Sequence, residues 1–186
     1  AEIVDTHQAP VYVVHATQSA AVDQAAALLS SGTLRTSAAV DRKALTEAMR
    51  GFRFAGGFGK TLSSLLHAGI AVHHAGMLPR YRRLVETLAQ QGLIAVICGT
   101  DTLGVGINVP IRTVLFSSLV KFDGRRERTL RAREFHQIAG RAGRAGFDTV
   151  GYVVAQAPDH EVENVRIAAK FAGDEKKLRS VRRKKA

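Results

Sequence analysis

The chain alternates short, almost purely apolar runs with segments that favour helices. Val11–His15 reads VYVVH and Leu93–Cys98 reads LIAVIC, so neither run shows the apolar–polar alternation of a strand that faces water on one side. Continuous apolar runs of this length are typical of strands that are covered on both faces. We therefore expect an α/β fold with three layers, in which helices cover both faces of a mostly parallel sheet.

The same kind of residue pattern predicts where the remaining helices and strands lie. Proline at position 79 suits a first helical turn, and Gly92 suits the end of that helix. Further strands are expected at 70–73, 113–116 and 150–155, and helices at 20–29, 41–50, 61–67, 79–91, 133–140 and 161–171. In parallel sheets ligands gather beyond the carboxyl ends of the strands, so the residues after each strand are the first candidates for a site.

Composition excludes several classes of protein. With 186 residues, 46% of them hydrophobic, the chain is long enough for one packed domain. Its apolar runs are far shorter than the roughly 20 residues that span a membrane, so we expect no membrane partner. Cys98 is the only cysteine, which excludes an internal disulfide and a cysteine-based zinc cluster and favours a cytoplasmic location. The start at Ala1 rather than methionine suggests a piece of a longer polypeptide.

Positive charge is concentrated in two blocks. The formal net charge is +11, of which residues 121–133 carry +4 and residues 175–186 carry +6. Such blocks are typical of contacts with a polyanion, and nucleic acid is the leading candidate partner. The alternative is a solvated loop and a solvated tail.

Two glycine-containing segments could bind phosphate. The first, Gly99–Pro110, reads GTDTLGVGINVP and follows a predicted strand, where Thr100 offers a hydroxyl and a backbone N–H. A tight strand-to-helix connection is the alternative interpretation. The second, Gln137–Arg144, reads QIAGRAGR. If its helix continues, Arg141 and Arg144 lie on one face and present two guanidiniums to a phosphoryl group.

Two other patterns do not support a site. Residues 56–61 read GGFGKT and end like a P-loop, but the position that needs the first glycine is Phe54, so we expect a glycine-rich turn before a helix. His73 and His74 are adjacent and face opposite ways in a strand, which argues against a shared metal ion. We expect no metal site in this chain.

Taken together, the segments resemble the second RecA-like domain of a superfamily 2 helicase of the Ski-type DExH branch, close to its actinobacterial members. The resemblance runs from about Val11 to Asp159. It is strongest in three blocks: HHAGMLPRYRRLVE at 73–86, the motif V block GTDTLGVGINVP at 99–110, and the motif VI block QIAGRAGRAG at 137–146. It implies a RecA-like helicase domain over residues 1–172, containing motifs IV to VI, followed by a basic linker or tail at 173–186.

The resemblance also implies roles for single residues. Arg141 and Arg144 resemble paired arginine fingers that reach the γ-phosphate of ATP, and Gln137 resembles a residue that touches the nucleotide or the facing domain. If Arg141 and Arg144 lay in the interior, or were locked to local carboxylates away from the edge of the sheet, this assignment would fail. Three positions of motif V are expected near the nucleotide: Asp101, Gly106 and Asn108. The expected nucleic-acid contacts are Thr100, His74, Gly76, Lys121, Arg125 and Arg126.

In such helicases ATP and Mg²⁺ lie between two RecA-like domains. The 186 residues contain neither a P-loop nor a DExH acid pair, so we expect the N-terminal RecA-like domain of the same polypeptide to bind most of the nucleotide, and this chain alone to be inactive. The expected substrate is single-stranded or partly duplex nucleic acid, with RNA preferred over DNA. Two alternatives remain at this point: a basic nucleic-acid-binding module without catalysis, and a self-contained NTPase that uses Lys60.

Overall fold

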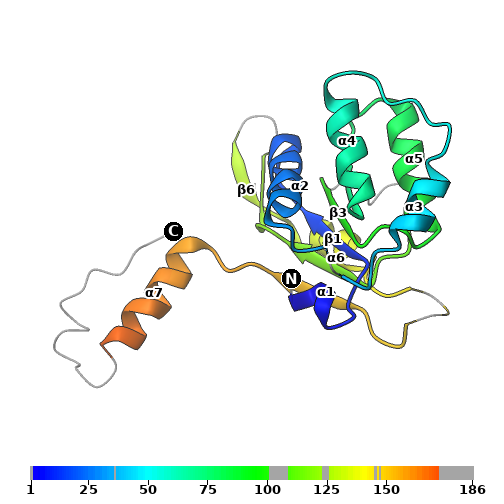
Figure 1. Cartoon of the computed structure of the whole chain (residues 1–186). Coiled ribbons are helices and arrows are strands. Elements are labelled where there is room, and N and C mark those ends of the chain that lie inside the picture. Colours follow the sequence, from blue (N-terminus) through cyan, green and yellow to red (C-terminus); the bar gives the residue numbers. More distant parts are fainter. Residues whose placement is uncertain are drawn as a thin grey trace.

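The structure is a computed structural model that describes residues 2–35, 37–100, 109–122, 126–144, 146 and 148–171. Within these residues the main sheet has five strands in the order β2-β3-β1-β4-β7, and every neighbouring pair is parallel. The strands are β1 (Val11–Val14), β2 (Ile70–His73), β3 (Val96–Gly99), β4 (Thr113–Phe116) and β7 (Tyr152–Ala155). A two-stranded antiparallel hairpin, β5 (Val120–Phe122) and β6 (Glu127–Thr129), extends beyond the sheet (Figure 1).

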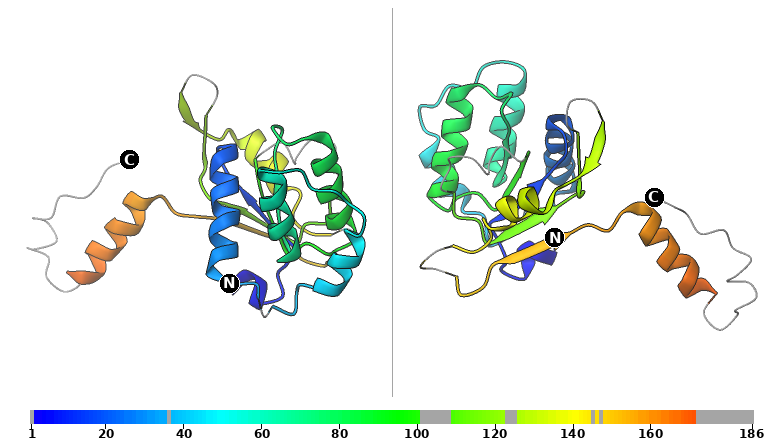
Figure 2. Two further views of the ribbon diagram at one scale, coloured as in Figure 1. Left: turned by 45° about the horizontal axis from the view of Figure 1, so that its top comes forward. Right: turned by 180° about the vertical axis from the view of Figure 1, so that it is seen from behind.

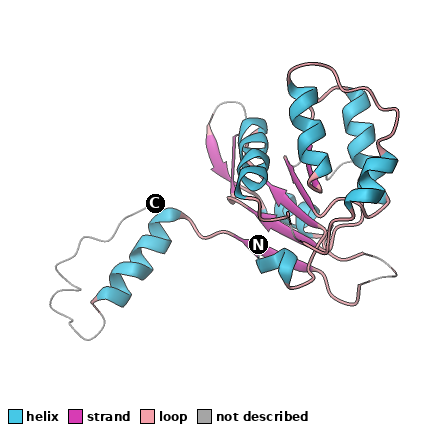
Figure 3. Cartoon of the chain, viewed as in Figure 1, coloured by secondary structure: helices cyan, strands magenta, loops and turns pink. Residues whose placement is uncertain are grey.

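Helices cover both faces of the sheet. Figure 3 shows the sheet between helices, and Figure 2 shows α6 in front of the sheet when the molecule is seen from behind. The helices are α1 (Glu2–Asp5), α2 (Gln18–Ser31), α3 (Arg42–Ala48), α4 (Phe58–His67), α5 (Pro79–Gln90), α6 (Ala132–Ala139) and α7 (Asp159–Lys170). The three-layer α/β fold predicted from the sequence is therefore confirmed.

Three neighbouring strands, β2, β3 and β1, are buried because they are apolar on both faces. All four residues of β1, of β2 and of β3 are buried, as the uninterrupted apolar runs predict. On one face, α2 packs against β2 and β3 beside α4. On the other face, the ring of Phe135 in α6 stacks on Phe116 at the end of β4, with ring centroids 4.9 Å apart.

Local signals fix several helix ends. Thr17 caps α2 by accepting a hydrogen bond from the backbone N–H of Ala20 at 3.2 Å, and Gly32 ends the helix in the left-handed conformation. Asp41 caps α3 in the same way through the N–H of Ala44. Pro79 occupies the first turn of α5, as expected.

Several sequence predictions differ from the structure, and the differences at α4, at β3 and at the hairpin are the clearest. Helix α4 begins at Phe58, three residues earlier than expected, and β3 begins at Val96 rather than Leu93. The hairpin was not predicted. Its strands are three residues long and carry charged side chains, which is a weak strand signal.

Helix α7 lies apart from the body of the molecule (Figures 1 and 2). None of its described residues is buried, and Val153 and Val154 of the neighbouring edge strand β7 are 44% and 38% exposed. The sequence predicts a helix here, which the structure confirms, but α7 contributes no buried side chain. The predicted domain boundary at residue 172 lies outside the described residues.

Candidate nucleic-acid and nucleotide surfaces

The carboxyl ends of four adjacent strands form one continuous edge. The backbone N–H of Thr100 bonds to the carbonyl of His73 at 3.3 Å, that of His15 to Gly99 at 2.8 Å, and that of Ser117 to Val14 at 3.0 Å. These bonds extend the ladder past the ends of β2, β3, β1 and β4. The sheet thus brings Thr100 and His74 to one edge, where ligands of parallel sheets gather.

Thr100 is held at this edge by the strand beside it. It is 7% exposed, and its carbonyl accepts a hydrogen bond from the hydroxyl of Tyr12 in β1. Gly99 allows this close packing, because a Cβ there would meet the carbonyl oxygen of His73 and the ring of Tyr12. The start of the motif V block is therefore fixed in position by the core.

His73 and His74 differ in their surroundings, as their adjacent places in and after β2 predict. The Nε2 of His73 lies 3.0 Å from Oε1 of Glu86 in α5, whereas the buried Nδ1 of His74 has no hydrogen-bond partner. Burial lowers the pKa of both histidines, while Glu86 partly opposes this for His73. Both imidazoles are therefore favoured in the neutral form.

His74 and Gly76 border a cleft of about 290 Å³ between the start of α2 and the start of α5. Its walls are mainly apolar side chains, among them Phe58, Met77 and Leu78. A cleft of this kind fits the flat, weakly polar surface of a base or sugar better than it fits a bare phosphate.

The motif VI block lies at the opposite end of the strands. Ala142 forms a parallel bridge with Ile111, two residues before β4, and the N–H of Gly143 bonds to the carbonyl of Ile111 at 2.9 Å. Arg141 and Arg144 therefore lie beside the amino end of β4. The structure does not bring them together with Thr100 and His74.

The helix expected at 133–140 does not continue under the two arginines, so Arg141 and Arg144 do not share one helix face. Helix α6 ends at Ala139, and Gly140 caps it. Gly143 then takes a φ of +93°, which turns the chain between the arginines and is accessible to glycine without strain. The glycines of QIAGRAGR end the helix rather than clear one of its faces. Gln137 remains on α6, exposed.

Arg144 is paired with a carboxylate of its own loop. Its Nε and Nη2 donate to the two oxygens of Asp148, both at 2.7 Å, and its backbone N–H donates to the same carboxylate at 2.9 Å. This pair lowers the pKa of Asp148 to about 2, chiefly through the hydrogen bonds from the Arg144 side chain. It argues against Arg144 as a freely reaching finger.

The hairpin carries the internal basic block and a carboxylate that partly neutralises it. Glu134 at the start of α6 accepts two hydrogen bonds from Arg128, both at 2.7 Å, and lies 3.7 Å from Nζ of Lys121. These contacts lower the pKa of Glu134 to about 2, with the Arg128 hydrogen bonds as the first cause. Arg126 is exposed, while Lys121 is half-buried.

Some expected site residues lie outside the described residues. They are Asp101, Gly106, Asn108 and Arg125. Sequence reasoning also missed four residues that the structure places in these surfaces: Arg112, Glu134, Asp148 and Tyr12. Two of them have a local signal: Asp148 stands four residues after Arg144, and Glu134 stands at the third position of α6, where its carboxylate accepts from the backbone N–H of Arg131.

The GGFGKT segment forms the start of α4, as a glycine-rich turn before a helix. Gly57 precedes the helix, and Lys60 is exposed on its first turn. Residues 52–55 before it are described and contain no strand. The hydroxyl of Tyr81 accepts from the N–H of Ala55 at 2.9 Å and fills the space beside Gly59. The P-loop architecture of strand, phosphate-binding loop and helix is therefore absent from residues 52–67.

The described residues contain neither a metal-binding cluster nor a membrane-spanning helix. No cluster of three or more His, Cys, Asp or Glu side chains suited to a metal ion occurs in the part of the chain that the structure describes. None of the described helices has the length and apolar content that a bilayer crossing requires. Cys98 is free and buried in β3, and burial raises the pKa of its thiol to about 12.

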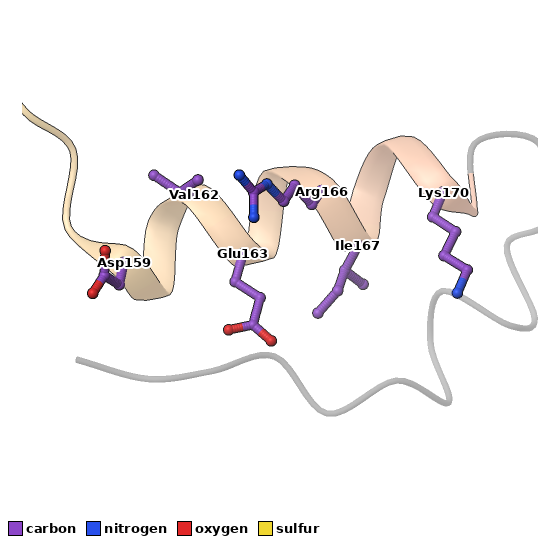
Figure 4. Close-up of a pocket in the computed structure, with 6 residues that line it drawn as sticks. All are labelled: Asp159, Val162, Glu163, Arg166, Ile167 and Lys170. Carbon is purple, nitrogen blue, oxygen red and sulfur yellow. The ribbon is translucent and has the colours of Figure 1, made fainter. Parts of the chain in front are cut away.

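A cavity of about 680 Å³ runs along α7, and its described lining comes from that helix alone. Figure 4 shows Val162 on the opposite side of the helix from Glu163 and Ile167. The lining residues are Asp159, Val162, Glu163, Arg166, Ile167 and Lys170. With no second described element closing it, this surface does not form a candidate site.

Comparison with known proteins identifies the family. The pattern of the helicase conserved C-terminal domain matches residues 53–146, just over half of the chain. The DExH-box ATP-dependent RNA helicase DExH11 of Arabidopsis thaliana is 44% identical over 119 residues, which cover 64% of this chain and 9% of that protein. The antiviral helicase SKI2 of Saccharomyces cerevisiae is 51% identical over 94 residues, 50% of this chain and 7% of that protein.

An actinobacterial relative has a sequence identity between those of the two relatives above. The probable helicase HelY of Mycobacterium tuberculosis is 49% identical over 86 residues, which cover 46% of this chain and 10% of HelY. The matched parts thus make up a tenth or less of the length of these relatives. The chain belongs to the helicase conserved C-terminal domain family, and its relatives are Ski2-type DExH helicases, actinobacterial HelY among them.

Proposed function

We propose that this chain is the C-terminal motor domain of an ATP-dependent nucleic-acid helicase. In this proposal the carboxyl-end edge of the sheet grips one strand, and the motif VI loop faces ATP that is bound mainly by an N-terminal RecA-like domain of the same polypeptide. The observation that carries it is the separation of the two surfaces: Thr100 lies after the carboxyl end of β3, and Arg141 lies beside the amino end of β4. Two separate surfaces on one domain suit a motor, because domain closure on ATP at one surface then moves the strand that is bound at the other.

The residues of the motif VI loop fit a nucleotide phosphate. Arg141 is half-buried, and the side chain of Arg144 is 28% exposed, so both are within reach of a ligand at the surface. Guanidiniums stay charged at any working pH and bind phosphate oxygens through two parallel hydrogen bonds. Mg²⁺ would neutralise phosphate charge, and we assign its ligands to the N-terminal RecA-like domain. Gln137, exposed on α6, would contact the nucleotide or that domain.

The nucleic-acid surface joins the sheet edge to the hairpin. Thr100, His74 and Gly76 would contact the strand at the edge, and the basic residues of the hairpin would hold its phosphates. Neutral, buried imidazole suits His74 as a hydrogen-bonding rather than a charged contact. We prefer RNA over DNA as the substrate, in single-stranded or partly duplex form, since the Arabidopsis relative is named an RNA helicase.

The other expected site residues would also contribute to the motor. Asp101, Gly106 and Asn108 would link the strand to the nucleotide site, and Arg125 would add a phosphate contact. The chain alone would not hydrolyse ATP, and the complete polypeptide would act in the cytoplasm. A basic nucleic-acid-binding module without catalysis is the alternative, which the hairpin charges also suit.

A strand-displacement assay on the complete polypeptide distinguishes the helicase from the binding module. A duplex with a single-stranded tail, made once of RNA and once of DNA, is mixed with the protein with and without ATP. The helicase proposal expects ATP-dependent displacement that Arg141→Ala abolishes while strand binding persists. Displacement that does not respond to ATP would support the module instead.

A further inference from the structure

The carboxylate of Asp148 is the most deeply buried charged group of the motif VI loop. Its side chain is 2% exposed, although it lies in a loop, and it contacts Arg144 through three hydrogen bonds. The N–H of Asp148 also donates to the carbonyl of Arg144 at 2.9 Å, which closes the turn between them. Burial of a charge is costly unless it is paired, so this arrangement holds the Arg144 and Asp148 side chains together.

The pairing with Asp148 leaves part of the Arg144 guanidinium available to a ligand. Asp148 binds Arg144 from the side, through Nε and Nη2, and these two groups use two of the five N–H donors. Among the described residues Nη1 has no hydrogen-bond partner. The outer edge formed by Nη1 and Nη2 therefore remains able to bind a second pair of oxygens, such as those of a phosphoryl group.

A second arginine, Arg112, forms an ion pair with the same carboxylate but no hydrogen bond to it. The Nε of Arg112 lies 3.6 Å from Oδ1 of Asp148, and its Nη1 donates to the carbonyl of His7 at 2.6 Å. The backbone of Arg112 is itself part of the ladder, since its N–H bonds to Pro10 and its carbonyl to Tyr152. Asp148 thus connects Arg144 to the amino ends of β4 and β7.

We propose that Asp148 is a positioning residue that fixes the direction in which Arg144 presents its outer guanidinium edge to the nucleotide. The inference rests on the proposed function, in which Arg144 contacts the transferring phosphoryl group. Asp148 itself touches no substrate: it acts through Arg144, and Arg112 holds it to the sheet. The loss of entropy on ordering a long arginine side chain then occurs during folding rather than during ATP hydrolysis.

A double-mutant cycle on nucleic-acid-stimulated ATP hydrolysis by the complete polypeptide tests this role. Asp148→Asn removes the charge at constant size, and Arg144→Ala removes the group that it positions. A shift of about 1 Å in a catalytic group costs about 100-fold, so we expect Asp148→Asn to lower kcat about 10- to 100-fold while KM for ATP stays the same. In the Arg144→Ala background it should have less than about a twofold further effect.

Two additional variants separate positioning from folding. Asp148→Glu keeps the buried charge but moves the carboxylate by one methylene, so kcat should fall while the melting temperature is retained. This variant keeps the inference testable if Asp148→Asn does not fold. Glu47→Gln is the matched control, because it breaks another arginine–carboxylate pair, Arg50 with Glu47 at 2.7 Å, on the exposed surface of α3.

The outcomes distinguish this inference from the proposed function. If Arg144→Ala lowers kcat but both Asp148 variants turn over ATP like the wild type, the positioning role is overturned and the proposed function stands. If Asp148→Asn is equally harmful with and without Arg144, the role is structural and the inference is again overturned. If Arg144→Ala has no effect, the role of Arg144 in the proposed function fails, and the inference fails with it.

Discussion

Arg144 and Asp148 hold each other through two side-chain hydrogen bonds of 2.7 Å, four residues apart and across a turn. The pair lowers the pKa of Asp148 from 3.8 to about 2. In the unfolded chain the carboxyl takes up its proton at higher pH than in the folded chain. The stabilisation by this pair is therefore fully present above pH 3.8 and is lost as the pH falls towards about 2.

The Arg144–Asp148 pair makes the free energy of unfolding depend on pH in the acidic range. We expect the free energy of unfolding to fall between about pH 3.8 and pH 2, and to fall less steeply in Asp148→Asn, because the variant has no carboxyl to protonate. Urea titrations over this range measure both slopes. Glu47→Gln removes an exposed carboxylate and serves as the control. Equal slopes for wild type and Asp148→Asn would contradict the pair's contribution.

The stack of Phe135 on Phe116 anchors α6, and with it the motif VI loop. Phe116 is fully buried, and the rings lie 4.9 Å apart with an angle of 21° between their planes. Phe135→Ala should lower the free energy of unfolding by about 2 kcal/mol, less than for a fully buried phenylalanine because Phe135 is only half-buried. Chemical denaturation measures this loss.

Val165 on α7 provides the control for that substitution. It is 65% exposed, so Val165→Ala should change the free energy of unfolding by less than about 0.5 kcal/mol. Equal effects of the two substitutions would show that the aromatic stack does not anchor α6.

Much of the fold could be predicted from the sequence because its signals are local. The strands at 11–14, 70–73 and 113–116 lie where the apolar runs are, and Gly32 and Pro79 mark helix ends. Helix α6 shows the limit of such signals. The helix expected at 133–140 is present, but its continuation to Arg144, which would place Arg141 and Arg144 on one face, is not, because Gly140 and Gly143 end the helix and turn the chain.

The contacts of the candidate sites were harder to predict. Arg112 reaches Asp148 and His7 only because the sheet brings together segments that are 36 and 105 positions apart in the sequence. The contact of Tyr12 with Thr100, 88 positions apart, has the same origin. No spacing rule along the chain contains these pairs. The sequence could therefore name the arginines and the threonine, but not the groups that hold them.

Glu134 limits the positive charge of the hairpin, since it pairs with Arg128 and lies near Lys121. Glu134→Gln should strengthen binding to single-stranded RNA. It should also steepen the plot of log affinity against log salt by up to about one unit, because one more phosphate is neutralised. Fluorescence anisotropy across a salt series measures both quantities. Unchanged affinity and slope would contradict a role for the hairpin charges.

Lys60 lies on the exposed first turn of α4, in the segment that ends like a P-loop. Because no strand precedes this segment within residues 52–55, its lysine should not bind nucleotide. Lys60→Ala in the complete polypeptide should keep KM for ATP and kcat within about twofold of wild type. A large rise in KM would instead support a self-contained NTPase in this chain.

The central claim is that the motif VI loop supplies cationic side chains to ATP. The most direct test is the rate of nucleic-acid-stimulated ATP hydrolysis by the complete polypeptide with Arg141→Ala and Arg144→Ala combined, at saturating ATP and RNA. By analogy with the arginine finger of GTPases, we predict a loss of about 10³-fold or more in a variant that stays folded and retains its RNA affinity, although loss of the Arg144–Asp148 pair lowers its melting temperature. Hydrolysis at the wild-type rate by the folded double variant would contradict the account.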